Sequence, residues 1–186
     1  VIALVVTGIL ALSTYVIKPK AVEAGNENAK AVTYFMQGDW AKALNGDDAE
    51  CIGFQAIADE YKLFPGGKLA ALYAGVCYYQ LGQYEDAVAY LNKFSADDLT
   101  IEPAALQLMG DAYVQMEEYA KAVKAFEAAA KSGNEMIAPM SLKKAGLVYL
   151  EMGDKAAAKK AFETIKADYA NSTEAQGIEK YIAIAE

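Results

Sequence analysis

Residues 75–94 read GVCYYQLGQYEDAVAYLNKF, and the chain repeats this pattern twice more. The second copy, GDAYVQMEEYAKAVKAFEAA, begins at Gly110, and the third, GLVYLEMGDKAAAKKAFETI, begins at Gly146. A Tyr follows the first Gly of each copy by three residues, and the starting glycines are 35 and 36 residues apart. Recurrence at this period predicts an array of similar structural units.

Each copy has the apolar spacing of two amphipathic helices. Apolar positions at i, i+3, i+4 and i+7 share one face of a helix. The first helices carry this face at Ala71, Ala74, Gly75 and Tyr78, at Leu106, Met109, Gly110 and Tyr113, and at Leu142, Ala145, Gly146 and Tyr149. The second helices carry a matching face at Ala87, Leu91 and Phe94, at Ala122, Phe126 and Ala129, and at Ala158, Phe162 and Ile165. We expect the Gly of each first helix to admit a close crossing by the second.

A short turn between the two helices falls at Gly82, Glu117 and Gly153. Gly suits a helix end because it tolerates positive φ, so Glu117 predicts a less tight turn in the second copy. The whole pattern resembles the tetratricopeptide repeat (TPR), whose period is about 34 residues. It implies an all-α fold in which antiparallel helix pairs stack into a solenoid, with units at residues 68–102, 103–138 and 139–171.

A degenerate first repeat is predicted at residues 26–67. The segment TYFMQGDWAKAL (residues 33–44) has a turn Gly at 38 and places Trp40 where the next two copies have Tyr84 and Tyr119. An insertion, NGDDAE, follows at residues 45–50, and an amphipathic helix is predicted from Cys51 to Tyr61. At the other end, residues 172–186 are predicted to form one capping helix that begins at Ser172.

The N-terminal residues 1–17, VIALVVTGILALSTYVI, contain no charge. A helix of this length reaches about 25 Å, slightly less than a bilayer core. We therefore predict a single transmembrane anchor, N-terminally incomplete, followed by a juxtamembrane linker at residues 18–25 in which Pro19 discourages a straight continuation of the helix. A cleaved signal peptide, with a small-residue site at 11–13, is the competing interpretation. Small residues spaced by four on the anchor suggest contact with another span: Ala3, Thr7 and Ala11.

The charge composition argues against catalysis and nucleic-acid binding. All 17 basic residues are Lys, there is no His, and the net charge is −8. The commonest general base is therefore missing, and the negative field repels a phosphate backbone. No cofactor or metal site is predicted, because the acidic run Asp47, Asp48 and Glu50 lacks the alternating ligands of a Ca²⁺ loop. Cys51 and Cys77 are interpreted as small buried apolar residues, although a disulfide stays open.

The layout as a whole resembles a bacterial family. A span, a broken repeat with ALNGD, further TPR units and an IEKYIAIAE tail are similar to TPR proteins of Bacteroidetes type and, more distantly, to the YfgM family. That resemblance implies an inner-membrane, single-pass protein with its repeats in the periplasm, associated with the Sec translocon and binding a periplasmic chaperone or secreted clients. Residues 1–17 would contact lipid. By contrast, Lys18 and Lys20 alone would favour a cytoplasmic repeat domain.

A partner-binding groove is expected on the first helices, as in other TPR arrays. The resemblance places its lining at Leu69, Leu72, Val76, Tyr79 and Gln80, at Gln107, Asp111, Val114 and Gln115, and at Met140, Lys143, Leu147, Leu150 and Glu151. This mostly apolar lining suits a helix or an extended apolar peptide. The alternative is that neighbouring helices and the tail cover it. The predicted function is a non-enzymatic scaffold of the translocation machinery, or alternatively a structural adaptor of another envelope complex such as an outer-membrane assembly or secretion machine.

Overall fold

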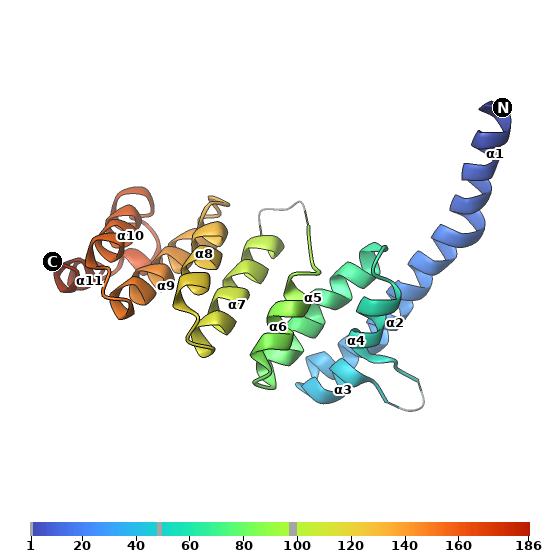
Figure 1. Ribbon diagram of the computed structural model, residues 1–186, viewed down its shortest axis with the longest axis horizontal. Helices are drawn as coiled ribbons and strands as arrows, with labels where there is room; N and C mark the ends of the chain where they lie inside the picture. The colour runs from blue at the N-terminus through green and yellow to red at the C-terminus, as the bar shows by residue number, and fades with distance from the viewer. Residues whose placement is uncertain (1, 48–49, 97–99) are drawn as a thin grey trace. The chain divides into compact units, whose positions relative to one another are not determined.

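The computed structural model describes residues 2–47, 50–96 and 100–186, without the side chains of residues 2–4, 8 and 9. All regular elements in these ranges are helical, as the all-α prediction requires. The chain forms two compact units, residues 1–94 (unit 1) and residues 95–186 (unit 2). Unit 1 contains α1 (Ile2–Leu12), a π-helical turn (Ser13–Ile17), α2 (Lys18–Met36), α3 (Trp40–Asn45), α4 (Gly53–Glu60), α5 (Pro65–Gln80) and α6 (Tyr84–Leu91) (Figure 1).

The N-terminal helix does not end at Pro19. The Lys18 N–H donates to the Ser13 carbonyl in a wide π-helical turn, and Pro19 then occupies the first turn of α2. A proline ring would clash with the preceding carbonyl in a regular helix interior, and a wide turn just before it accommodates the ring. Residues 18–25, predicted as a juxtamembrane linker, are therefore helical and continue to Met36.

Val5–Met36 is by length and composition apolar enough to cross a membrane, and none of its most apolar stretch is buried. A signal sequence has the same properties. Of the three small residues predicted to face another span, Thr7 and Ala11 are exposed, and the side chain of Ala3 lies outside the described part.

Aromatic rings hold the core of unit 1 together. The Phe35 ring packs edge-on against Trp40 and Tyr73, with centroids 5.1 and 4.9 Å away, and Phe54 stacks on Tyr73 at 4.8 Å. Phe54 is fully buried on α4, which lies against α2 and α5. The predicted helix from Cys51 to Tyr61 is present, shortened to the bounds of α4.

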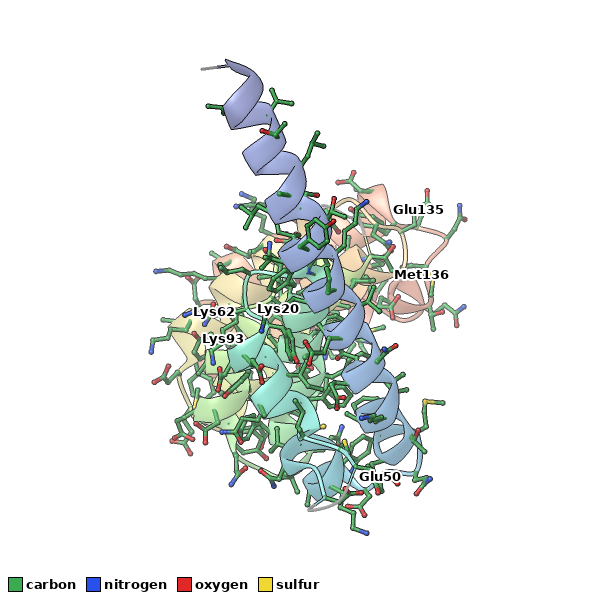
Figure 2. All side chains as sticks on the ribbon, turned by 90° about the vertical axis from the view of Figure 1, so that its right-hand side faces the viewer. Lys20, Glu50, Lys62, Lys93, Glu135 and Met136 are labelled. Atoms are coloured by element: carbon green, nitrogen blue, oxygen red, sulfur yellow. The ribbon has the colours of Figure 1, made fainter. Side chains whose placement is uncertain are left out.

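The insertion divides the second helix of the degenerate repeat into α3 and α4. Gly46 adopts φ 83°, and the Asp47 carboxylate accepts hydrogen bonds from the Tyr34 hydroxyl and from the backbone N–H groups of Glu50 and Cys51. The hydrogen bonds of the Asp47 carboxylate therefore stabilise the loop. Figure 2 shows Glu50 at the end of unit 1 that lies far from the N-terminus of the chain. Asp48, the middle acidic residue of the run, lies outside the described residues.

Unit 2 consists of antiparallel helix pairs. Its elements are α7 (Ile101–Gln115), α8 (Tyr119–Ala130), α9 (Ile137–Glu151), α10 (Lys155–Asp168), a 3-10 turn (Thr173–Ala175) and α11 (Glu179–Ile184). Each helix from α8 to α10 packs against the one before it. The helices α7 and α9 begin two residues before the predicted unit boundaries. In unit 1, α6 ends at Leu91, so Phe94 lies beyond the helix to which it was assigned.

The predicted crossings at glycine are confirmed. A Cβ added to Gly75 would approach Leu91 Cγ to 2.6 Å, and one added to Gly110 would approach the Phe126 ring to 2.5 Å. Gly146 faces the Phe162 ring in the same way. Each first helix therefore has a glycine at the position where a large side chain of the second helix packs against it.

The turn at Glu117 is as tight as those at the glycines, contrary to prediction. In the Gly82 turn, Gln83 N–H donates to the Tyr78 carbonyl at 2.9 Å, and Glu118 N–H donates to the Tyr113 carbonyl at the same distance. Glu117 adopts φ 59°, close to the 75° of Gly82. Packing of the flanking helices therefore imposes left-handed backbone on a residue that adopts it at a cost.

The predicted single capping helix at residues 172–186 is also wrong. Ser172 does act as a cap, because its hydroxyl accepts from the Ala175 N–H, but it caps only a 3-10 turn. Gly177 then adopts φ 72° and separates this turn from α11. The two short pieces still close the array, because Ile178 and Ile182 join the buried cluster around Phe162.

Candidate partner-binding surface

The predicted groove positions in unit 1 lie along α5. Leu69 and Gln80 are exposed, whereas Leu72 and Val76 are half-buried. Tyr79 is also half-buried and packs edge-on against the Tyr84 ring, with a centroid distance of 5.5 Å. This face therefore offers limited apolar surface, most of it at Leu69, whose exposed fraction is 39%.

In unit 2, two of the predicted groove residues bridge neighbouring first helices. The Gln107 amide donates to the Ser141 hydroxyl at 3.1 Å, and Lys144 Nζ contacts both carboxylate oxygens of Asp111 at 2.8 and 2.6 Å. Both bonds join α7 to α9. Gln107 and Asp111 therefore align the two helices and are already occupied within the chain.

Sequence reasoning missed the partners in these bridges, Ser141 and Lys144. A signal did exist, because the bridged residues are 34 and 33 positions apart, about one repeat period. The ion pair between Asp59 and Lys93 in unit 1 has the same spacing of 34. Complementary polar residues one period apart are thus the pattern to look for in stacked repeats.

The exposed part of the predicted groove in unit 2 lies on α9. Met140 and Leu147 occupy one face of the helix, two turns apart, with exposed fractions of 41% and 42%. Glu151 at the end of the same face and Gln115 on α7 are exposed, whereas Val114 is half-buried against the core around Phe126. This part of the surface combines two accessible apolar side chains with a nearby charged pair.

The C-terminal segment covers the other predicted positions on α9. Lys143 Nζ lies 5.4 Å from the ring centroid of Tyr181 on α11. Leu150 packs against the buried cluster that Ile178 and Ile182 help to form. The expectation that the tail covers the groove is therefore correct for these two residues, while Met140 and Leu147 stay accessible.

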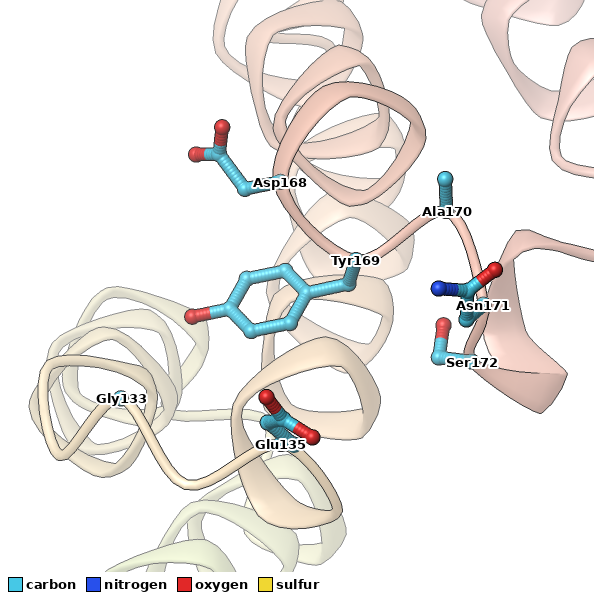
Figure 3. Close-up of a pocket in the computed structure, with 7 residues that line it drawn as sticks. All are labelled: Gly133, Glu135, Asp168, Tyr169, Ala170, Asn171 and Ser172. Atoms are coloured by element: carbon cyan, nitrogen blue, oxygen red, sulfur yellow. The ribbon is translucent and has the colours of Figure 1, made fainter.

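A polar cavity of about 300 Å³ lies between the loop before α9 and the loop after α10 (Figure 3). Its lining consists of Gly133, Glu135, Asp168, Tyr169, Ala170, Asn171 and Ser172. The Tyr169 ring extends between Asp168 and Glu135, and both carboxylates are exposed. Exposed carboxylates of this kind are well solvated, so the cavity offers no strong binding group.

The two cysteines are buried and unpaired. Burial raises the pKa of the Cys77 thiol to about 12, so the thiol is protonated at neutral pH. Burial likewise raises the pKa of Cys51. Neither sulfur is in the thiolate form that reacts with disulfides or binds metals. Among the described residues, no group of three or more Cys, Asp or Glu side chains is arranged to hold a metal ion.

Comparison with known families identifies the chain. The profile described as "T7SS, ESX-1 secretion system protein EccA1, N-terminal domain" matches residues 6–180. The chain belongs to this EccA1 N-terminal domain family. The family assignment thus replaces the distant YfgM resemblance and supports a secretion-system context. No curated protein matches the chain.

Solved structures similar to this EccA1-family chain share its helical-repeat fold. A crystal structure of MamA protein matches with a TM-score of 0.65 at 22% identity, covering 89% of this chain and 80% of that one. TPR-like repeats of a Podosopora anserina putative kinesin light chain match with a TM-score of 0.63 at 14% identity, covering 89% and 85%. At these identities the likeness shows the fold, a TPR-like array of stacked helix pairs, which is typical of protein-interaction domains.

Proposed function

We propose that this chain is a non-catalytic, membrane-tethered TPR adaptor of a bacterial secretion machine. It would bind a helix or an extended apolar segment of a partner protein on the first-helix face of unit 2. The observation that carries the proposal is the match of residues 6–180 to the N-terminal domain of a secretion-system protein. A secretion-machine adaptor fits this match better than an accessory role at the Sec translocon.

The surface chemistry supports a peptide partner. Met140 and Leu147 present apolar side chains two turns apart, the spacing at which a docked helix inserts its own apolar residues. The half-buried Asp111–Lys144 pair beside them holds its charges in fixed positions. Charges held in this way favour one register of a bound segment over others.

Site-specific crosslinking from membranes tests the function. A photoreactive residue at Leu147 should capture a component of a secretion complex, whereas one at the exposed Lys160 on α10 should not. Capture of Sec translocon subunits would favour the translocon role over the secretion-machine role. Equal capture from both positions, or none from Leu147, would reject this face as the binding surface.

The side of the membrane is a separate prediction. We keep the predicted periplasmic orientation as the one to be tested, although the family match replaces the YfgM resemblance that implied it and Lys18 and Lys20 favour the opposite orientation. Protease added to spheroplasts should digest the repeats if they are periplasmic. Protection of the repeats until the inner membrane is lysed would reverse the orientation.

A further inference from the structure

The turn between α4 and α5 lies beside the start of α2. At one end of α4, Phe54 packs on Phe35 near the end of α2, with ring centroids 6.1 Å apart. At its other end, Lys20 Nζ lies 3.9 Å from a Glu60 carboxylate oxygen. The Asn28 amide donates to the Gly66 carbonyl at 2.8 Å. α4 is therefore antiparallel to α2. Residues 61–64 lie beside the start of α2, where the apolar N-terminal helix begins to extend beyond the other helices of unit 1.

Apolar side chains are exposed around this turn. Leu63 has an exposed fraction of 84%, and Val22 on the adjacent part of α2 has 63%. Ile17 and Tyr15, five and seven residues before Val22, are also exposed. Leu63 thus adds exposed apolar surface at the turn beside the start of α2. In water this surface would be unfavourable, and a bilayer interface would cover it.

Lysines surround the same turn in a chain whose net charge is −8. Lys20 lies over the Tyr61 ring at 5.5 Å, and a cavity of about 330 Å³ beside the turn is lined partly by Lys62, Lys68 and Lys93. Figure 2 shows Lys20, Lys62 and Lys93 on one side of unit 1. With Lys18, these five lysines face four carboxylates, Glu23, Glu27, Asp59 and Glu60, so the turn carries a small local excess of positive charge. Asp59 pairs with Lys93 and Glu60 with Lys20.

We propose that residues 61–64 and the surrounding lysines form a second membrane contact, specific for anionic phospholipid. Leu63 enters the headgroup boundary while Lys18, Lys20 and Lys62 bind headgroup phosphates. Clusters of lysine directly next to a span are attracted to anionic lipid in this way. The contact rests on the membrane tether of the proposed function and adds a surface that orients unit 1 against the bilayer.

Three tryptophan variants of the full chain test this contact in vesicles that contain phosphatidylglycerol and brominated lipid. Tyr15→Trp reports insertion of the N-terminal helix, Leu63→Trp reports the proposed contact, and Leu81→Trp is the matched control. Leu81 is a similarly placed exposed leucine at the opposite end of α5, about 24 Å from the turn for a 16-residue helix. The native Trp40, packed against Phe35, supplies the background.

The expected result is strong quenching of Tyr15→Trp and Leu63→Trp, with Leu63→Trp quenched several times more than Leu81→Trp. Quenching at residue 15 with none at residue 63 would overturn the second contact and leave the tether intact. Absence of quenching at residue 15 would overturn both. Equal quenching at residues 63 and 81 would also overturn the proposal, because lipid would then contact unit 1 without selectivity.

A charge reversal tests the role of the anionic headgroup. In the Leu63→Trp background, Lys62→Glu should reduce quenching at least twofold in phosphatidylglycerol vesicles and change it little in purely zwitterionic vesicles. Lys42→Glu makes the same charge change on α3, at the far end of unit 1, and should have no effect. An equal response to the two reversals would show that net charge alone, and not this site, governs the contact.

Discussion

Units 1 and 2 are built from the same helix-pair repeat, but the repeat is regular in unit 2 and interrupted in unit 1. In unit 2 the helix pairs cross at Gly110 and Gly146, and polar bridges connect α7 to α9. In unit 1 the second helix of the first repeat is interrupted, and the rings around Phe35 fill the resulting space. Regular stacking therefore depends on small residues at crossings, whereas an irregular repeat can be held by a cluster of large side chains.

The largest expected difference between the units is their response to alkaline pH. Burial raises the pKa values of Tyr61, Tyr78, Tyr90 and Cys77 in unit 1 to about 12. In unit 2, burial and a hydrogen bond to Glu127 raise that of Tyr149 to about 12.

Each of these groups keeps its proton more firmly in the folded chain than in the unfolded one. Their contribution to stability is therefore complete below the unfolded pKa, about 10 for tyrosine and about 8.5 for cysteine, and is lost as the pH rises towards 12. Hydrogen exchange near pH 11 should show loss of protection in α4–α6 before α8–α10. Simultaneous loss in both units would contradict the comparison.

Removing a ring from the centre of unit 1 should have the next largest effect. Phe54→Ala would leave a cavity beside Phe35 and Tyr73 and should cost about 3–5 kcal/mol of unfolding free energy. Denaturant unfolding measures the cost, and hydrogen exchange locates it. Phe126→Ala in unit 2 is the matched change at an equally buried Phe. If Phe54→Ala exposed α8 and α9 as much as α4 and α5, the units would unfold as one body.

Adding a methyl group at a crossing should destabilise unit 2 through overpacking. Gly146→Ala would place a Cβ against the fully buried Phe162 ring, at a cost of about 1–3 kcal/mol. Gly25→Ala on α2 meets no atom within 4 Å and is the control. It should instead stabilise the helix by about 0.5–1 kcal/mol. Equal effects of the two changes on the denaturation midpoint would show that Gly146 is not needed for the crossing.

The smallest expected effect concerns the turn in which Glu117 occupies the position that glycine has in the other repeats. Glu117→Gly should stabilise the chain by about 1 kcal/mol, because Gly adopts φ 59° without the strain of a side chain. The reciprocal change, Gly82→Glu, should destabilise unit 1 by a similar amount. Both are measured by thermal unfolding. A decrease in stability for Glu117→Gly would mean that the greater freedom of Gly in the unfolded chain outweighs the relief of strain.

Much of the repeat architecture could be predicted from sequence, because the residues that determine it recur at a regular spacing along the chain. The spacing of Gly and Tyr placed the helix pairs and the crossings at Gly75, Gly110 and Gly146 correctly. The candidate surface was predicted less completely. All groove positions were predicted together from the family resemblance. Only the contacts between helices show that Met140 and Leu147 are exposed, whereas Asp111 already binds Lys144.

The amino-acid pattern by itself determined the fold class, the pairing of helices and the apolar character of the N-terminal segment, because these follow from local periodicity and composition. Tertiary structure alone decided that Glu117 adopts left-handed backbone, that Gly177 divides the tail, and that Glu60 at the end of α4 lies beside Lys20 at the start of α2. Each of these features depends on side chains brought together from distant parts of the chain. The free energy of packing them exceeds the local preference of the residue concerned.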